Sequence, residues 1–258
     1  ATASRGSSPT QRIDQPHSSS HTAVSSKASL SEHRARRHAE TTAAAAGDTQ
    51  PLRPGIEVDA LPWPAVAEQL ASTARQSLLD LLSGVTKRLE SNDAPAIALV
   101  GTRPGVGTTT TLLAIAKLVA GVGGRVAIVD ASGAGGAASS LGVRRCAHLD
   151  ARVEPTAVDD LLVSSRGCGT SVLAVSTGDA KPFATVALGR LLATHDLVLI
   201  DSGDATEWLN AGGADRSAIL VIDDDTSEGT HARYATAAQL ESVGVTTTGF
   251  VETYTPLR

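Results

Sequence analysis

The chain has 258 residues, of which 41% are hydrophobic but only 2% aromatic, so it has room for one α/β domain of ordinary size and a tail. Its formal net charge of −5 divides unevenly. Residues 1–55 hold seven Lys and Arg against four Asp and Glu (+3), which leaves 15 against 23 (−8) for the rest. An acidic globular part argues against nucleic acid as its main partner.

The first 55 residues are rich in Ser, Thr, Ala, His and Arg and contain almost no large apolar side chain. Such a segment cannot bury enough surface to offset the entropy lost on ordering. We therefore predict a disordered low-complexity tail over residues 1–55.

The cysteines and the hydropathy indicate a cytoplasmic protein. Cys146 and Cys168 have neither the spacing of a metal site nor the number needed for a disulfide framework, which fits a reducing compartment. No apolar run approaches the roughly 18 residues of a membrane span, and no secretory signal is visible.

A lead-in segment over residues 56–95 begins where the composition turns apolar. Pro64 suits the first position of a helix, and apolar residues at helical spacing from Val66 to Leu89 predict one flanking helix. We expect it to pack on the flank of a sheet and to end near residues 91–95.

From residue 96 onward, apolar strands alternate with helices. Strands are expected at 97–101, 125–130, 171–176, 196–201, 217–223 and 245–251, with helices after 108, over 158–164, 183–194 and 230–243, and around Trp208. This alternation predicts a doubly wound, mostly parallel sheet with ligands at the carboxyl ends of its strands. His195 is interpreted as a residue at a helix end, near the negative end of the dipole.

A glycine-rich loop joins the strand Ile97–Gly101 to the next helix, and the rest of the domain is organised around it. It reads Gly101-Thr-Arg103-Pro104-Gly105-Val106-Gly107-Thr108-Thr109-Thr110. Glycines let the backbone fold round an anion, and the free amides of a helix start carry the positive end of the dipole. The pattern indicates a phosphate-binding loop, with a glycine-rich turn without a ligand as the alternative.

Two apolar strands end in aspartate, at Asp130 and Asp201. An acid at the tip of a strand beside a phosphate loop can hold magnesium or its waters, although aspartates also end strands as turn formers or caps. With the loop present we favour the metal interpretation for both. The run Asp223-Asp224-Asp225 also ends a strand, and three acids in series are interpreted as a solvated turn.

These parts resemble, over roughly residues 56–252, the P-loop domain of bacterial tyrosine kinases, the cytoplasmic partners of capsule and exopolysaccharide chain-length proteins. That family lies within the wider MinD/ParA-like class of P-loop ATPases. The loop is similar to its Pro-Gly-x-Gly-Lys-Ser/Thr, Gly124–Asp130 to its Walker A′ strand and Asp196–Ser202 to its Walker B strand. The resemblance implies a P-loop NTPase-like domain over residues 96–258 that binds ATP or ADP with magnesium.

The resemblance assigns roles to individual residues. The loop residues Gly101 and Arg103 to Thr110 would hold the nucleotide, Thr109, Asp130 and Asp201 would hold the metal, and both aspartates with Arg103 would serve catalysis. Arg103 aligns with an extra lysine of MinD-like ATPases and could clamp a phosphate, with an exposed loop arginine as the alternative.

This sequence departs from the family's motifs at residues that carry the chemistry. Thr108 stands where the family has the loop lysine, and Ser132 where it has the second Walker A′ acid. The tyrosine-rich tail is missing, which leaves Tyr254 as the candidate phospho-acceptor. Fold inheritance is therefore better supported than kinase activity.

Three functions stay open at this stage. The leading one is a degenerate kinase relative, with nucleotide binding weak or lost, that regulates polysaccharide export with a membrane chain-length protein and as a homo-oligomer. It would be cytoplasmic, held at the inner face of the membrane through that partner, with no span of its own. The alternatives are an active tyrosine autokinase that uses Arg103 and Tyr254, and a MinD/ParA-like positioning ATPase.

Overall fold

The computed structural model describes residues 52–92, 96–132, 136–143, 157–175, 188–203, 217–224 and 227–253. All of them belong to one compact unit, Asp48–Arg258. The predicted tail up to residue 51, the helix expected around Trp208 and the candidate acceptor Tyr254 lie outside the described residues.

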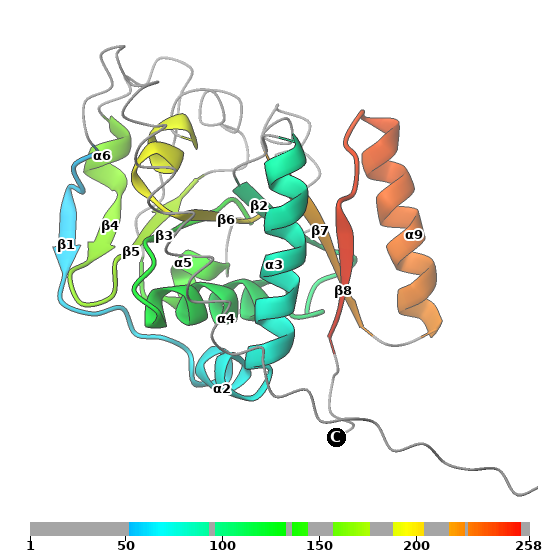
Figure 1. Ribbon diagram of the computed structural model, residues 1–258, viewed down its shortest axis with the longest axis horizontal. Helices are drawn as coiled ribbons and strands as arrows, with labels where there is room; N and C mark the ends of the chain where they lie inside the picture. The colour runs from blue at the N-terminus through cyan, green and yellow to red at the C-terminus, as the bar shows by residue number, and fades with distance from the viewer. Residues whose placement is uncertain are drawn as a thin grey trace, which may run out of the picture. The chain divides into compact units, whose positions relative to one another are not determined.

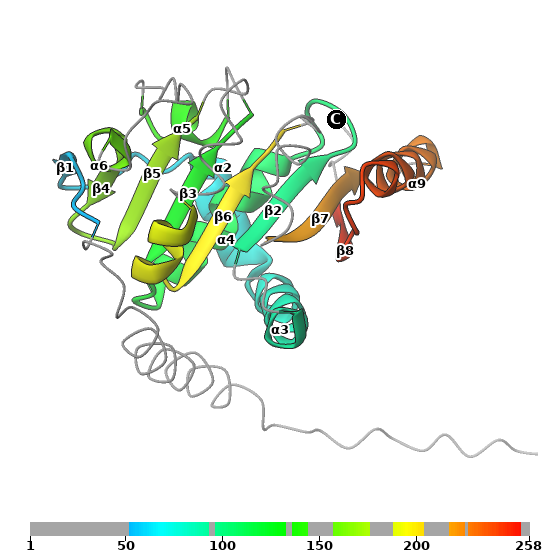
Figure 2. The same ribbon diagram turned by 90° about the horizontal axis from the view of Figure 1, so that it is seen from above.

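The described strands form one sheet in the order β1-β4-β5-β3-β6-β2-β7-β8 (Figure 2). Their bounds are β1 Ile56–Val58, β2 Ala96–Gly101, β3 Val126–Asp130, β4 Val163–Ser165, β5 Thr170–Ala174, β6 Leu197–Asp201, β7 Ser217–Asp224 and β8 Gly249–Thr253. Every neighbouring pair is parallel except β4 with β5. The predicted α/β fold with a mostly parallel sheet is confirmed.

Helices cover both faces of the sheet (Figure 1). On one face lie α2 (Ala65–Thr73), α3 (Arg75–Asn92), α4 (Thr108–Gly121) and α5 (Ala137–Ser140). On the other lie α6 (Ala157–Leu161), the helical residues 188–194 and α9 (Ser227–Ser242). None of the described helices combines the length and apolar character needed to cross a bilayer.

The central strands are buried along their whole length because helices cover both of their faces. Every residue of β2, β3 and β7 is buried, and alternate residues of β2 belong to opposite cores: Ile97 and Leu99 to one, Ala96, Ala98 and Val100 to the other. Strands buried on two sides are expected to be continuous apolar runs of small aliphatic residues, as these are.

The structure departs from the expected elements mainly at the flank and edge. The lead-in helix is two helices, α2 and α3, separated at Ala74, whose φ and ψ of −101° and 21° are not helical. The helix expected over 158–164 ends at Leu161, and residues 163–165 form β4 between β1 and β5. β1 was not predicted, since three residues carry too little of an alternating pattern. The last strand begins at Gly249 rather than at residue 245.

Candidate functional site

The glycine-rich loop connects the end of β2 to the start of α4 at the carboxyl edge of the sheet. Gly105 and Gly107 have φ of 86° and 96°, a region that residues with a side chain rarely adopt. A Cβ at Gly101 would come within 2.5 Å of Thr108 Oγ1, so the loop closes tightly over the strand end. Thr108 itself is buried.

The loop presents a run of backbone donors with no acceptor of their own. In the described part of the chain, none of the amide N–H groups of residues 105–110 donates a hydrogen bond, whereas the next amide, of Thr111, donates to Gly107 O at 2.8 Å. Unpaired amides at a helix start, with the positive end of the dipole behind them, favour an anion. The loop residues therefore fit a phosphate group.

The end of the sheet holds the loop in place. The Thr102 amide donates to Ile222 O at 3.0 Å, which extends the β2–β7 ladder by one step. The Thr253 hydroxyl, at the end of β8, lies 2.6 Å from Val106 O and 3.0 Å from Asp223 O. The chain passes through the loop in a conformation fixed by two neighbouring strands.

Asp130 and Asp201 lie side by side because β3 and β6 are parallel and in register at these residues. The Thr109 hydroxyl donates to Asp201 Oδ2 at 2.8 Å, which joins α4 to the end of β6. The amides of Ala137 and Gly203 also donate to the Asp201 carboxylate, at 3.2 and 3.3 Å. The sheet thus brings the loop threonine and both strand-end aspartates to one edge.

The electrostatics of this pair disfavour a charged Asp201. Its burial raises the pKa of the carboxyl, and the nearby Asp130 raises it further, while hydrogen bonds from Thr109, Gly203 and Ala137 act the other way. A cation placed beside the pair would relieve this unfavourable interaction.

Ser132 and Gly136 enclose the Asp130 carboxylate. Ser132 donates to Asp130 Oδ1 from its hydroxyl at 2.6 Å and from its amide at 3.1 Å, and the Ala138 amide donates to Oδ2 at 2.8 Å. A Cβ at Gly136 would lie only 2.3 Å from Oδ1, so no larger residue fits there. Ser132, noted from sequence only as a missing acid, is a hydrogen-bond donor that orients Asp130.

The residues Asp223 and Asp224 do not form a solvated turn. Both are buried, and each faces an arginine: Asp223 Oδ2 accepts from Arg233 Nε at 3.3 Å, and Asp224 forms an ion pair with Arg103. Polar partners from distant segments hold these acids inside. Arg103, predicted to contact phosphate, is thus held by a carboxylate in this structure.

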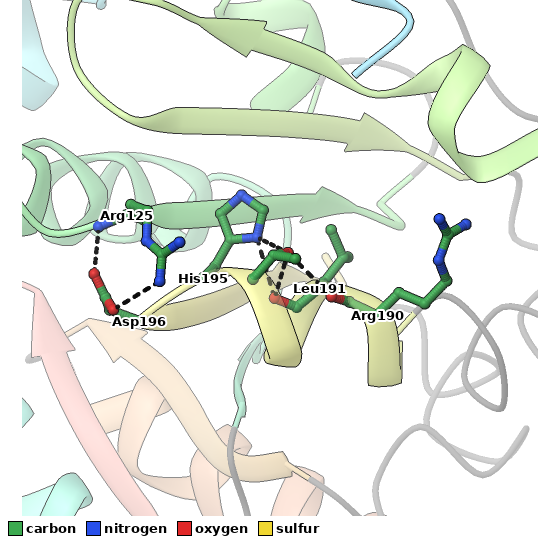
Figure 3. A network of polar contacts seen from close by, with 6 residues as sticks. Arg125, Arg190, Leu191, His195 and Asp196 are labelled. Carbon is green, nitrogen blue, oxygen red and sulfur yellow. Dashed lines mark hydrogen bonds and ion pairs between the residues drawn. The ribbon is translucent and has the colours of Figure 1, made fainter. Parts of the chain in front are cut away.

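A second polar network, drawn in Figure 3, lies at the amino end of the strands, away from the loop. His195 follows the helical residues 188–194; its Nδ1 lies 3.1 Å from Leu191 O and its Nε2 3.0 Å from the Ser171 hydroxyl. Burial lowers the pKa of His195 to about 4, despite the Leu191 carbonyl and Asp196. The residue does end a helix as expected, but it is neutral, so it gains no charge–dipole interaction at neutral pH.

The described residues contain no cluster of three or more His, Cys, Asp or Glu side chains that would hold a metal by themselves. Magnesium usually takes only one or two protein carboxylates and completes its shell with water and phosphate oxygens. Thr109 with Asp201 and Asp130 is an oxygen donor set of that kind.

Comparisons with known proteins agree on the architecture. No family model and no curated protein sequence matches the chain. Among solved structures, the kinase domain of the Escherichia coli tyrosine kinase ETK matches with a TM-score of 0.59 and 14% identity, over 80% of this chain and 92% of that one. The fold is P-loop NTPase-like, as it is in that kinase domain.

Two further structures extend this likeness. The chimerical protein CapA2B2 matches with a TM-score of 0.56 at 16% identity over 78% of this chain and 93% of that one. The MinD cell division protein of Aquifex aeolicus matches at 0.51 and 20% identity over 64% and 70%. The fold is therefore shared with bacterial tyrosine-kinase domains and with MinD-like ATPases.

The structure gathers most of the residues predicted for the site, with the loop, Asp130 and Asp201 at one edge of the sheet. It adds residues that sequence reasoning missed: Gly136, Asp223, Asp224, Arg233 and Thr253. The available signal was the position of Asp223 and Asp224, which end an apolar strand as Asp130 and Asp201 do.

Proposed function

We propose that the chain binds the phosphates of ATP or ADP, as the magnesium complex, on the loop over residues 101–110. One observation carries the proposal: the run of unpaired amides at residues 105–110 lies beside the hydrogen-bonded pair Thr109–Asp201. Phosphate-binding loops use these two components, amides for the anion and an oxygen set for the metal.

The residues divide the work by chemistry. The loop amides would donate to phosphate oxygens, while Thr109, Asp201 and Asp130 would supply oxygens to magnesium or to its water ligands. The bound ion would neutralise charge on the phosphates and on the two carboxylates. A cation would favour the charged form of Asp201, whose pKa is raised by burial and by Asp130.

Phosphoryl transfer is the weaker part of this site, because Thr108 supplies no cation. Its hydroxyl lies close to Gly101 and carries no charge, so it cannot replace a lysine ammonium at the phosphates. Removing one preorganised charge-stabilising group typically costs about 3–4 kcal/mol in the transition state, a factor of hundreds or more. We infer a protein that binds nucleotide weakly and transfers phosphate poorly.

The biological role follows from the resemblance to tyrosine kinases of polysaccharide export. We propose a pseudokinase-type regulatory partner of a membrane chain-length protein in exopolysaccharide or capsule biosynthesis, cytoplasmic and acting as an oligomer. Similarity to the ETK domain over 92% of its length supports this branch.

Two other functions remain as alternatives. An active autokinase would need Arg103 to leave Asp224 and Tyr254 to accept the phosphate. A positioning ATPase is favoured only by the likeness to MinD, which covers less of the chain. Phosphotyrosine that disappears in Tyr254→Phe would select the first, and nucleotide-dependent dimerisation without phosphotyrosine the second.

The test is calorimetric titration of the full chain with Mg–ATP and Mg–ADP, for the wild type, Thr108→Lys and Asp201→Asn. We expect weak binding by the wild type, tighter binding by Thr108→Lys and loss in Asp201→Asn. Asp196→Asn, at the opposite end of β6, is the matched control and should bind as the wild type does.

Two results separate the outcomes. Binding by Thr108→Lys but not by the wild type would mean that the chain no longer binds nucleotide, although the rest of the site is intact. If neither the wild type nor Thr108→Lys binds nucleotide, although the circular dichroism of both chains is that of folded protein, the proposed site is refuted.

A further inference from the structure

The register between β2 and β7 continues past the end of β2 as side-chain pairs. Gly101 lies opposite Ile222, so the next two steps place Thr102 beside Asp223 and Arg103 beside Asp224. The Thr102 hydroxyl donates to Asp223 Oδ1 at 3.2 Å, and the Arg103 guanidinium forms an ion pair with the Asp224 carboxylate. Arg103 is the only cationic residue in the loop over residues 101–110.

The two members of the Arg103–Asp224 pair differ in freedom. The Asp224 side chain is 7% exposed and ends a strand buried along its whole length, whereas the Arg103 side chain is 52% exposed on a loop. The carboxylate is therefore fixed, and the guanidinium can turn to another acceptor. A planar guanidinium binds phosphate as readily as carboxylate.

The neighbouring pair, Arg233 with Asp223, is held by further contacts of the arginine. Arg233 comes from α9 and its side chain is only 15% exposed. Besides Asp223, it contacts Glu252 Oε1 on β8 at 2.7 Å, and its guanidinium lies 5.5 Å from the Phe250 ring centre. Arg233 thus joins α9, β7 and β8, and the cation that can leave its carboxylate without loosening the sheet is Arg103.

We propose that Asp224 determines the loop's affinity for phosphate by competing with the ligand for Arg103. The proposal rests on the proposed function, because it assumes that phosphate binds on this loop. A carboxylate offers one negative charge, so a ligand must offer more to draw the guanidinium away. The terminal phosphate of a nucleoside di- or triphosphate carries about two negative charges near neutral pH, and a singly charged anion does not displace Asp224.

The competition predicts a gain of affinity from a substitution that removes charge. In Asp224→Asn, Arg103 is released before the ligand arrives, so we expect Mg–ATP to bind the full chain at least tenfold more tightly than it binds wild type. Arg103→Ala should bind more weakly than wild type. In the double variant the Asn substitution should give no gain, because its benefit passes through Arg103.

The matched control is Asp196→Asn, which removes a half-buried carboxylate from an ion pair with Arg125 at the far end of the sheet. It should leave the Mg–ATP affinity unchanged. Sodium nitrate and inorganic pyrophosphate serve as probes of charge: the wild type should bind pyrophosphate but not the singly charged nitrate on this loop, and Asp224→Asn should bind pyrophosphate more tightly. Asp224→Ser replaces the Asn variant if the latter does not fold.

A measurement without ligand tests the same contact. Arginine side-chain NMR should resolve restricted Nη protons for Arg103 in the free protein, and Asp224→Asn should remove the restriction.

The outcomes distinguish this proposal from the proposed function. Equal affinities of the wild type and Asp224→Asn overturn the competition and leave the phosphate loop standing. A gain that persists without Arg103 also overturns it, because Asp224 would then act by simple repulsion. No binding by any variant, Thr108→Lys included, overturns both.

Discussion

His195 gives the sharpest prediction about stability, because its neutral form is built into the fold. Its Nδ1 faces the Leu191 carbonyl, which can only accept, so Nδ1 carries the proton and Nε2 accepts from the Ser171 hydroxyl. A second proton would place a charge in the core near Arg125, whose own charge opposes it. Asp196 partly offsets that opposition.

The magnitude follows from the pKa. Lowering the pKa of His195 from 6.5 to about 4 means that the unfolded chain binds this proton more tightly than the folded one does. Each tenfold difference in proton affinity is worth about 1.4 kcal/mol, so the charged form costs the folded state about 3 kcal/mol. The stability linked to His195 is complete above pH 6.5 and is lost as the pH falls from 6.5 through 4.

The assay compares urea unfolding of the wild type and His195→Gln at pH 7.5 and pH 5. Over this range the wild type should lose about 2 kcal/mol more than the variant, since the variant has no imidazole to protonate. Taking the difference between the two chains cancels other titrating groups, including Asp201, which acts in the opposite direction. His231→Gln, which removes an exposed histidine on α9, should follow the wild type.

Parallel pH profiles for the wild type and His195→Gln would refute the reasoning. An imidazole NMR titration of the wild type is the second readout and does not depend on the variant folding. A midpoint for His195 near 6.5 would show that the buried neutral state is not enforced.

Two further predictions concern the carboxyl edge. Gly136→Ala should lower the free energy of unfolding by about 1–3 kcal/mol, because the added Cβ would collide with the Asp130 carboxylate. Gly84→Ala, in open space on α3, should instead raise it by up to about 1 kcal/mol, and equal effects in urea titrations would contradict the first. Asp201→Asn should abolish Mg–ATP binding, and its free energy of unfolding relative to that of the wild type should be higher at pH 7 than at pH 5. Because the pKa of Asp201 is raised in the folded state, the wild type loses the cost of this buried charge as the pH falls towards 5, and a difference that does not change with pH would count against the reasoning.

The centre of the fold was predictable because its signals are local. Strands such as Ile97–Gly101 and 196–201 are apolar runs that end in Gly or Asp, and a parallel sheet brings such ends to one edge. The edge was not predictable in the same way. β1 and β4 have three residues each, and their pairing, rather than their own sequence, makes them strands.

The site was predictable to the extent that it consists of motif residues. The aspartates at 130 and 201 follow from their positions at strand ends. Burial of Asp223 and Asp224 depends instead on partners far away in sequence, and no local sequence pattern reveals these partners. Thr102, for example, is 121 residues from Asp223. A run of three acids is usually hydrated, and here two tertiary arginine contacts reverse that expectation.

The arrangement of charge at the carboxyl edge argues for a ligand rather than for a scaffold alone. Asp130, Asp201, Asp223 and Asp224 are all buried there. Two of them face arginines, but Asp130 and Asp201 face each other, and burial raises the pKa of Asp201. A buried carboxylate without a cation lowers stability, because nothing offsets the cost of removing its charge from water. This unfavourable pair lies beside the loop whose amides over residues 105–110 donate no hydrogen bond to the residues that the structure describes. The two carboxylates attract a cation and the loop amides attract an anion. A magnesium–phosphate complex would satisfy both at once.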